Sequence, residues 1–168
     1  MKKKDLFWLL LSPAYLIIGI IRHEGCHALA AMVESLEVHK FVFWPSIGPG
    51  GNFYFGYVSW AGTASWMTIA APYAGDLLTF AVGFALCAYA KIRRRWIWIN
   101  ILILTVLSPL INSAYNYFGG IRNGNDIGFL LQALNPIAIH AYFGLTLAVY
   151  AVGFWLCLRK RKTDPSLT

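Results

Sequence analysis

Charge is scarce in this sequence. Only 12% of the 168 residues are Asp, Glu, Lys or Arg, whereas 58% are hydrophobic and 16% are aromatic. A soluble domain normally carries about 25% charged residues. The composition therefore excludes an ordinary soluble domain and favours an integral membrane protein.

Cysteine pairs and nucleotide-binding motifs are also missing. Cys26, Cys87 and Cys157 are scattered and form no CxxC pair. Their spacing excludes a disulfide framework, and we interpret each one as a small apolar packing residue. The turn at Pro49-Gly50-Gly51 is not followed by Gly-Lys-Ser/Thr, which excludes a phosphate-binding loop.

Long uncharged runs take the place of the missing charges. Residues 6–21, 96–118 and 127–158 contain no charged side chain. These runs approach or exceed the roughly 20 residues that a membrane-spanning helix requires. The first run is too long for a signal peptide and continues into a polar motif, so we expect a span there. We predict an α-helical polytopic membrane protein with four spans, over residues 6–33, 63–90, 96–117 and 137–158.

The basic residues form three clusters, and each cluster lies next to the end of an apolar run. The clusters are Lys2–Lys4, Lys91 with Arg93–Arg95, and Arg159–Lys162. Four spans place both termini and all three clusters on one side, which is the pattern of cytoplasmic segments. We therefore expect both termini to be cytoplasmic, and we attribute the net charge of +7 to topology rather than to nucleic-acid binding. Residues 1–162 are predicted to form one membrane domain, followed by a disordered tail over 163–168.

Two connecting segments have sequence patterns of their own. Residues 37–60 are aromatic and β-branched on both flanks of a turn at residues 49–52, which predicts a β-hairpin between the first two spans. Two roles for this hairpin stay open: an edge strand that pairs with an extended substrate, or an aromatic belt at the membrane interface. In residues 116–136, glycines break the helix, and Asp126 is predicted to be the N-cap of a short helix.

The first span contains a polar motif within the stretch IIRHEGCHALAAM, residues 20–32. His23 and His27 are four residues apart, so both imidazoles lie on one face of a helix and can bind one metal ion, while Glu24 can act on a metal-bound water. Ionisable side chains inside a span are costly and usually functional. The motif predicts a Zn2+ site with Glu24 as the catalytic general base. A polar patch paired with another helix is the alternative.

A catalytic zinc uses three protein ligands and one open position, so a third ligand must come from elsewhere. Glu34 is roughly 10 Å further along the helix axis, which is too far. Asp126 is favoured because its glycine-rich loop lies on the side of the membrane toward which the histidines lie. Asp76 and His140 are the alternatives, and Asp76 is also a candidate ion-pair partner of Arg122. The predicted metal ligands are His23, His27 and Asp126.

The stretch RHEGCHALAAMVE, residues 22–34, resembles the first motif of the site-2 protease family of intramembrane zinc metalloproteases, in which HExxH is followed by alanine and other small residues. The core of that family contains the HExxH helix, a membrane-associated β-hairpin and an aspartate ligand two spans later. This chain has the three features in the same order, over roughly residues 15–134. Its second motif, Gly-Asn-Asp-Ile-Gly around Asp126, differs from Leu-Asp-Gly and is similar to that of the shorter bacterial relatives.

The resemblance implies an intramembrane zinc metalloendopeptidase that cleaves membrane-embedded or membrane-proximal peptides. Zinc would lower the pKa of its bound water to near neutrality, and Glu24 would take the proton and pass it to the leaving amine. Asn123 and Asn125 are candidate hydrogen-bond donors to the substrate, with plain turn residues as the alternative. A zinc hydrolase of a lipid or small amide and a non-proteolytic zinc-stabilised membrane subunit stay open. Self-assembly or a regulatory membrane partner is expected, because no soluble regulatory domain is recognisable.

Overall fold

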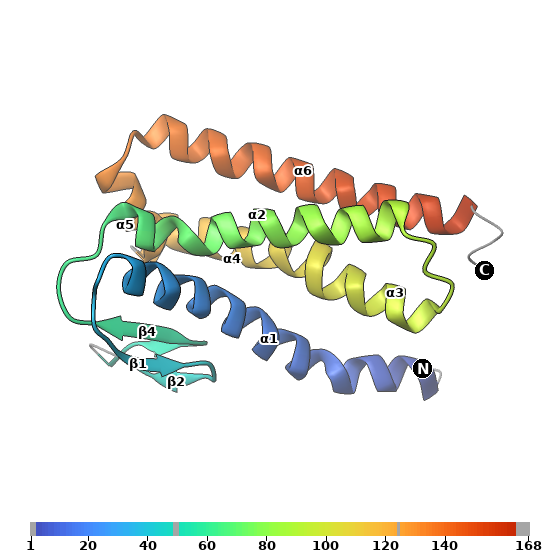
Figure 1. Cartoon of the computed structure of the whole chain (residues 1–168), viewed down its shortest axis with the longest axis horizontal. Helices are drawn as coiled ribbons and strands as arrows, with labels where there is room; N and C mark the ends of the chain where they lie inside the picture. Colours follow the sequence, from blue (N-terminus) through green and yellow to red (C-terminus); the bar gives the residue numbers. More distant parts are fainter. Residues whose placement is uncertain (1–2, 49–50, 124, 164–168) are drawn as a thin grey trace.

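Four long helical segments run side by side along the molecule (Figure 1). They are α1 (Lys3–Val33), α2 (Trp66–Tyr89), the continuous stretch of α3 (Arg95–Ile101), the π-helix η2 (Leu102–Leu107) and α4 (Ser108–Asn123), and α6 (Pro136–Thr163). A short helix, α5 (Asp126–Ala133), links α4 to α6. The computed structural model describes residues 3–48, 51–123 and 125–163, and only the backbone of residues 3–10, 122–123 and 162–163.

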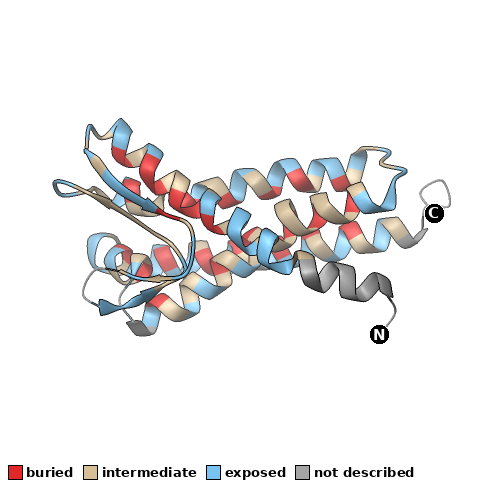
Figure 2. Cartoon of the chain, turned by 90° about the horizontal axis from the view of Figure 1, so that it is seen from below, coloured by how far each residue is buried: buried red, intermediate tan, exposed pale blue. Residues whose placement is uncertain are grey.

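The exposed surface of the bundle is mainly apolar. Four stretches are long and apolar enough to cross a membrane: Leu11–Val33, Trp66–Tyr89, Arg95–Ile121 and Pro136–Arg161. In each stretch only 28% of the apolar window is buried, and buried residues follow the faces where helices meet (Figure 2). Such extensive apolar exposure is typical of surfaces that lipid or a partner covers. The four predicted helices are confirmed. Of the tail predicted over 163–168, Thr163 ends α6 and the rest lies outside the described residues.

Between α1 and α2 the chain forms two small antiparallel sheets. The outer sheet pairs β1 (Val38–Val42) with β4 (Tyr57–Trp60), and the inner sheet pairs β2 (Ser46–Ile47) with β3 (Phe53–Tyr54). The two pairs follow one another like a single long hairpin with an interrupted ladder, so the predicted β-hairpin is confirmed. β1 and β4 lie against α1, at the end of the bundle opposite the start of that helix (Figure 1).

The junction between α1 and α2 is held by Glu34. Its carboxylate accepts hydrogen bonds from the backbone N–H of Ser65 at 2.9 Å and from the Ser65 hydroxyl at 2.5 Å. These side-chain and backbone hydrogen bonds lower the pKa of Glu34 below its ordinary value. Because Ser65 is the N-cap of α2, Glu34 orients the start of that helix instead of reaching the histidines.

A buried apolar cluster joins α2, α3, η2 and α6. Its buried members are Phe80, Cys87, Trp98, Leu102, Val106, Tyr150 and Cys157. Cys87 and Cys157 are free thiols buried in this cluster, which confirms their predicted role in packing. Cys26 is also a free thiol but is only partly buried. The helices approach closely next to this cluster, because a Cβ atom added at Gly83 would lie 1.8 Å from Oγ1 of Thr105.

We expect Gly83→Ala to destabilise the bundle by about 1–3 kcal/mol, because the added methyl group has to push α2 away from η2. Gly144→Ala is the matched control: a Cβ atom at Gly144 would meet nothing within 4 Å. The control substitution in α6 is expected to be neutral or stabilising by up to about 1 kcal/mol. Unfolding of detergent-solubilised protein by SDS measures both changes, and equal stability of the two variants would contradict the close approach.

Candidate metal centre

Three side chains that could bind a metal ion converge from α1 and α5. Nε2 of His27 lies 3.1 Å from Oδ2 of Asp126, and Nε2 of His23 lies 3.4 Å from the same oxygen. The potential ligand atoms of the three residues all lie within 4.8 Å of one another. The structure thus brings together the three residues that were predicted as ligands, although 99 residues separate His27 from Asp126.

Asp126 reaches the histidines because α5 folds back along α4. Ile127 and Leu130 of α5 are buried in a cluster with Tyr73 and Phe143. Gly120 of α4 makes this approach possible: a Cβ atom there would lie 2.6 Å from Cβ of Ile127. The clash would displace α5 and the aspartate at its start.

The prediction that Asp126 is the N-cap of α5 was wrong by one residue. Asn125 is the N-cap, and its side-chain oxygen accepts a hydrogen bond from the backbone N–H of Ile127 at 3.4 Å. Asp126 is the first helical residue, so its carboxylate is free of the capping bond and can face α1. Asn125 thus has a structural contact of its own, and its predicted contact with substrate stays a prediction. The side chain of Asn123 lies outside the described residues.

The ring of His27 is oriented by a backbone carbonyl of α2. Its Nδ1 atom lies 2.9 Å from the carbonyl oxygen of Thr68. A carbonyl oxygen only accepts, so Nδ1 carries the proton and Nε2 is left to face Asp126. An imidazole lone pair and a carboxylate oxygen 3.1 Å apart need a cation between them, either a proton or a metal ion. Such a hydrogen bond at the remote ring nitrogen is typical of metal-ligating histidines.

The ring of His23 is held from α4. Its Nδ1 atom lies 3.0 Å from Nδ2 of Asn112. The same amide donates to Oδ2 of Asp76 at 2.8 Å, and Asn116 donates to Oδ1 of Asn112 at 3.2 Å. The orientation of His23 therefore depends on polar side chains from α2 and α4 as well as on its own helix.

Asp126 carries a negative charge at neutral pH. Burial of its side-chain carboxyl group raises the pKa of Asp126. Hydrogen bonds with His23 and His27 outweigh that effect and hold the pKa well below its ordinary value. The hydroxyl of Tyr73 adds a long hydrogen bond to Oδ2 at 3.5 Å, and its ring centroid lies 5.8 Å from that of His23. The carboxylate is therefore in the form that binds metal ions.

Glu24 is buried beside the cluster. Its carboxylate is close enough to interact electrostatically with His23, His27 and Asp126. The hairpin lies directly over it, because a Cβ atom added at Gly56 would lie 3.1 Å from Cγ of Glu24. The predicted base thus lies close both to the three candidate ligands and to the hairpin.

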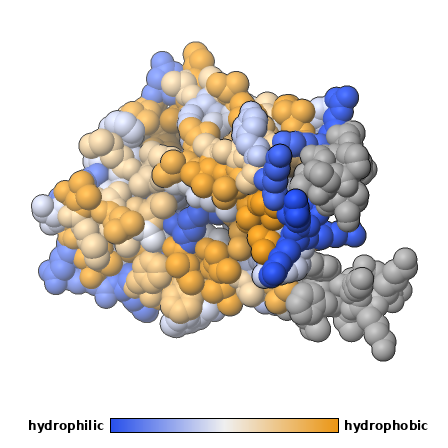
Figure 3. All heavy atoms as spheres, turned by 45° about the vertical axis from the view of Figure 1, so that its right-hand side comes forward, coloured by the Kyte–Doolittle hydropathy of each residue, from blue (hydrophilic) through white to orange (hydrophobic). Residues whose placement is uncertain are grey.

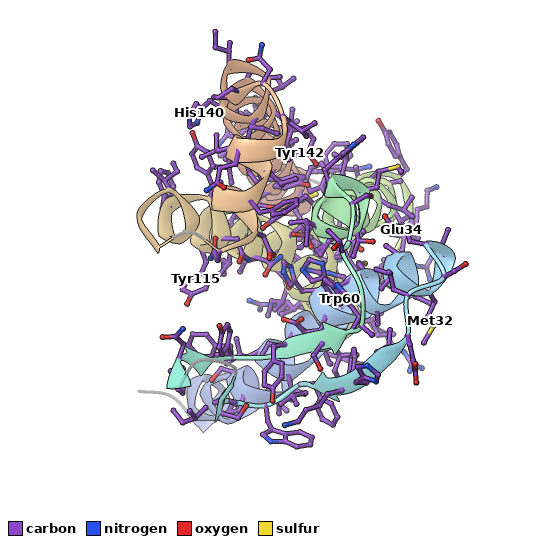
Figure 4. The ribbon with its side chains drawn as sticks, turned by 90° about the vertical axis from the view of Figure 1, so that its left-hand side faces the viewer. Met32, Glu34, Trp60, Tyr115, His140 and Tyr142 are labelled. Carbon is purple, nitrogen blue, oxygen red and sulfur yellow. The ribbon has the colours of Figure 1, made fainter. Side chains whose placement is uncertain are left out.

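The other candidate ligands lie elsewhere. Asp76 forms an ion pair with Arg22 at 2.7 Å. The side chain of Arg122, the partner considered for Asp76 from the sequence, lies outside the described residues. His140 is exposed and bonds the hydroxyl of Tyr117 at 2.9 Å. In Figure 4, His140 lies on α6, far from Trp60 and α1. Neither Asp76 nor His140 is grouped with the two histidines.

Several residues around the site escaped the sequence analysis. Tyr73 and Asn112 are polar residues inside apolar helices, and this is the only feature of the sequence that could have indicated a role for them in the site. Thr68 acts through its backbone carbonyl, which no residue pattern reveals. Trp60, at the end of β4, has its ring centroid 6.2 Å from that of His27 and marks where the hairpin reaches the site (Figure 4).

The donor set fits a catalytic zinc ion. Two imidazole nitrogens and one carboxylate oxygen are ligands that such sites use, and two ligands of a tetrahedral zinc lie about 3.3 Å apart. The separations of 3.1 and 3.4 Å from Asp126 to the histidines agree with this value. No family model matches the chain, and no curated protein or solved structure matches it either.

Proposed function

We propose that the chain is an intramembrane zinc metalloendopeptidase. His23, His27 and Asp126 would hold the metal ion, and Glu24 would be the general base. The observation that carries this proposal is the convergence of the three donor atoms within 4.8 Å beside a buried glutamate, on a helix long enough to cross a membrane.

The chemistry divides between the metal ion and the chain. Bound zinc would act as a Lewis acid on a water molecule and on the scissile carbonyl. The carboxylate of Glu24 would accept a proton from the attacking water and return it to the leaving amine nitrogen. Asp126 and the two histidines stay fixed during these transfers, because Thr68, Asn112 and Tyr73 contact them from α2 and α4.

The hairpin favours a peptide substrate over a lipid or a small amide. In the described part of the chain, β4 pairs only with β1, so its other edge is available for main-chain hydrogen bonds with an extended peptide. Trp60 at the end of β4 lies near His27, so a peptide paired with this strand would approach the site. Exposed aromatic residues of the hairpin, such as Trp44 and Phe53, are compatible with the interfacial belt as well.

The arrangement of the helix ends supports the proposed membrane topology. The start of α1, the α2–α3 connection and the end of α6 lie together at one end of the bundle (Figure 1). The basic clusters belong to these three segments, and the hairpin lies at the other end. We propose that the basic end is cytoplasmic, because basic segments are retained on that side.

Metal analysis of purified protein tests the ligand set. We expect one zinc ion per chain in the wild type, and affinity lowered on the order of 100-fold or more by His23→Ala or Asp126→Ala, because loss of an outer-shell contact alone typically lowers it by about 10–100-fold. His140→Ala is the matched control and should keep full zinc content. If Asp126→Ala retained full zinc and full cleavage, the aspartate would not be a ligand. Cleavage of lipids or small amides, but of no peptide, would support the alternative hydrolase.

A further inference from the structure

Two basic segments that are distant in the sequence form one surface. We define the basic end as the residues Lys91, Arg93, Arg94, Arg95, Arg159, Lys160 and Arg161. Arg161 joins the two parts: its guanidinium donates to the carbonyl oxygens of Ile92 at 2.7 Å and Arg93 at 3.3 Å. Lys160 donates to the carbonyl oxygen of Ala88. The end of α6 is thus fixed against the α2–α3 connection.

Among the acidic residues whose side chains the structure describes, none pairs with Lys91, Arg93, Arg94 or Arg95. Those acidic residues are Glu24, Glu34, Glu37, Asp76 and Asp126. They lie in the metal centre, at the α1–α2 junction, beside β1 and in the ion pair with Arg22. The four like charges of the α2–α3 connection lie close together in the chain and repel one another, and an anion that contacts several of them relieves that repulsion.

Exposed aromatic residues accompany these cations. Trp96 and Trp155 are 57% and 54% exposed, and the guanidinium of Arg159 lies 5.3 Å from the ring centroid of Trp155. Lys160 lies 5.7 Å from the ring centroid of Tyr89. The apolar outer faces of the helices begin directly beyond this level, and hydrophilic residues gather at this end of the molecule (Figure 3). Tryptophan, tyrosine and basic residues in this arrangement mark the headgroup level of a bilayer.

We propose that the basic end is a binding surface for anionic phospholipid headgroups. Arginine forks match phosphate oxygens in a bidentate manner, and the exposed aromatic rings and apolar helix faces beside them would contact the glycerol and acyl chains. A soluble polyanion such as nucleic acid would leave that apolar surface unused. The surface lies at the opposite end of the bundle from the metal centre, so the inference does not depend on the proposed enzymatic function (Figure 1).

Native mass spectrometry of detergent-solubilised protein, titrated with phosphatidylglycerol or phosphatidylcholine, tests this inference. Each basic residue near an anionic lipid surface strengthens binding about fivefold. We expect the wild type to prefer phosphatidylglycerol at least about tenfold, and Arg93→Gln/Arg94→Gln/Arg95→Gln to weaken that binding on the order of 100-fold. Arg94→Gln alone should weaken it about fivefold, which gives a measurement on a minimally changed protein.

Lys40→Gln provides the matched control, because Lys40 is an exposed cation on β1 at the other end of the molecule. This variant should keep the wild-type preference. Equal binding of the two lipids by the wild type, or an unchanged preference in the triple variant, would overturn the proposal. Displacement of phosphatidylglycerol by equimolar inorganic phosphate would also overturn it, because the surface would then bind free anions rather than headgroups.

Discussion

Replacing Glu24 by glutamine is expected to abolish peptide cleavage and to leave zinc bound. Glutamine has nearly the same shape as glutamate, so the buried site beside the hairpin keeps its packing. Its amide cannot accept a proton at neutral pH, and loss of a general base slows a reaction by about 10²–10⁴-fold. The three ligands, His23, His27 and Asp126, are unchanged, so the metal affinity should stay within a few-fold of wild type.

Single-turnover cleavage of a membrane-embedded peptide in proteoliposomes, measured together with zinc content, gives both quantities. Glu37→Gln is the matched control, because Glu37 is exposed and its carboxylate lies near the exposed imidazole of His39, at 3.9 Å, rather than near the metal centre. This control should cleave at the wild-type rate. Full activity of Glu24→Gln would remove the glutamate from the mechanism. If Glu24→Gln left the cellular phenotype unchanged while His27→Ala unfolded the protein, the non-enzymatic subunit would be the correct interpretation.

Asp76→Leu is expected to destabilise the folded bundle by about 3–5 kcal/mol, because it leaves the guanidinium of Arg22, whose side chain is only 17% exposed, without its partner. Asp76 is fully buried, and its Oδ1 lies 2.7 Å from a guanidinium nitrogen of Arg22. The same guanidinium donates to the carbonyl oxygen of Leu104 at 3.1 Å and to the hydroxyl of Ser108 at 3.2 Å. The ion pair therefore ties α1 to α2 and to the π-helix of the third span.

The double variant Arg22→Met/Asp76→Leu separates the ion pair from its surroundings. Replacing both charges by apolar side chains of similar size is often neutral or stabilising, so most of the lost stability should return. Asp76 also holds Asn112, which contacts His23, so the double variant should still bind zinc about 10–100-fold more weakly. SDS unfolding and zinc competition measure the two effects. A double variant as unstable as the sum of the single changes would contradict a paired role.

Much of the fold could be predicted because its signals are local. Runs of apolar residues indicated the four long helices, and flanking aromatic residues around a glycine turn indicated the hairpin. The spacing of His23 and His27 placed both imidazoles on one helical face, since residues four apart on a helix are neighbours. Asp126 could be chosen from chain order and the presumed side of the membrane. The exact place of Asp126 at the start of α5 could not be predicted, because the N-cap is decided by a single hydrogen bond to a backbone N–H.

The sequence by itself determined the apolar helices, the spacing of the two histidines and the grouping of charge into short clusters, because each is a property of neighbouring residues. The tertiary structure alone decided that Asp76 pairs with Arg22, that Thr68 orients His27, and that the α2–α3 connection and the end of α6 form one basic surface. These contacts join residues far apart in the chain. They depend on how closely helices approach at glycines such as Gly83 and Gly120, and no local pattern encodes that distance.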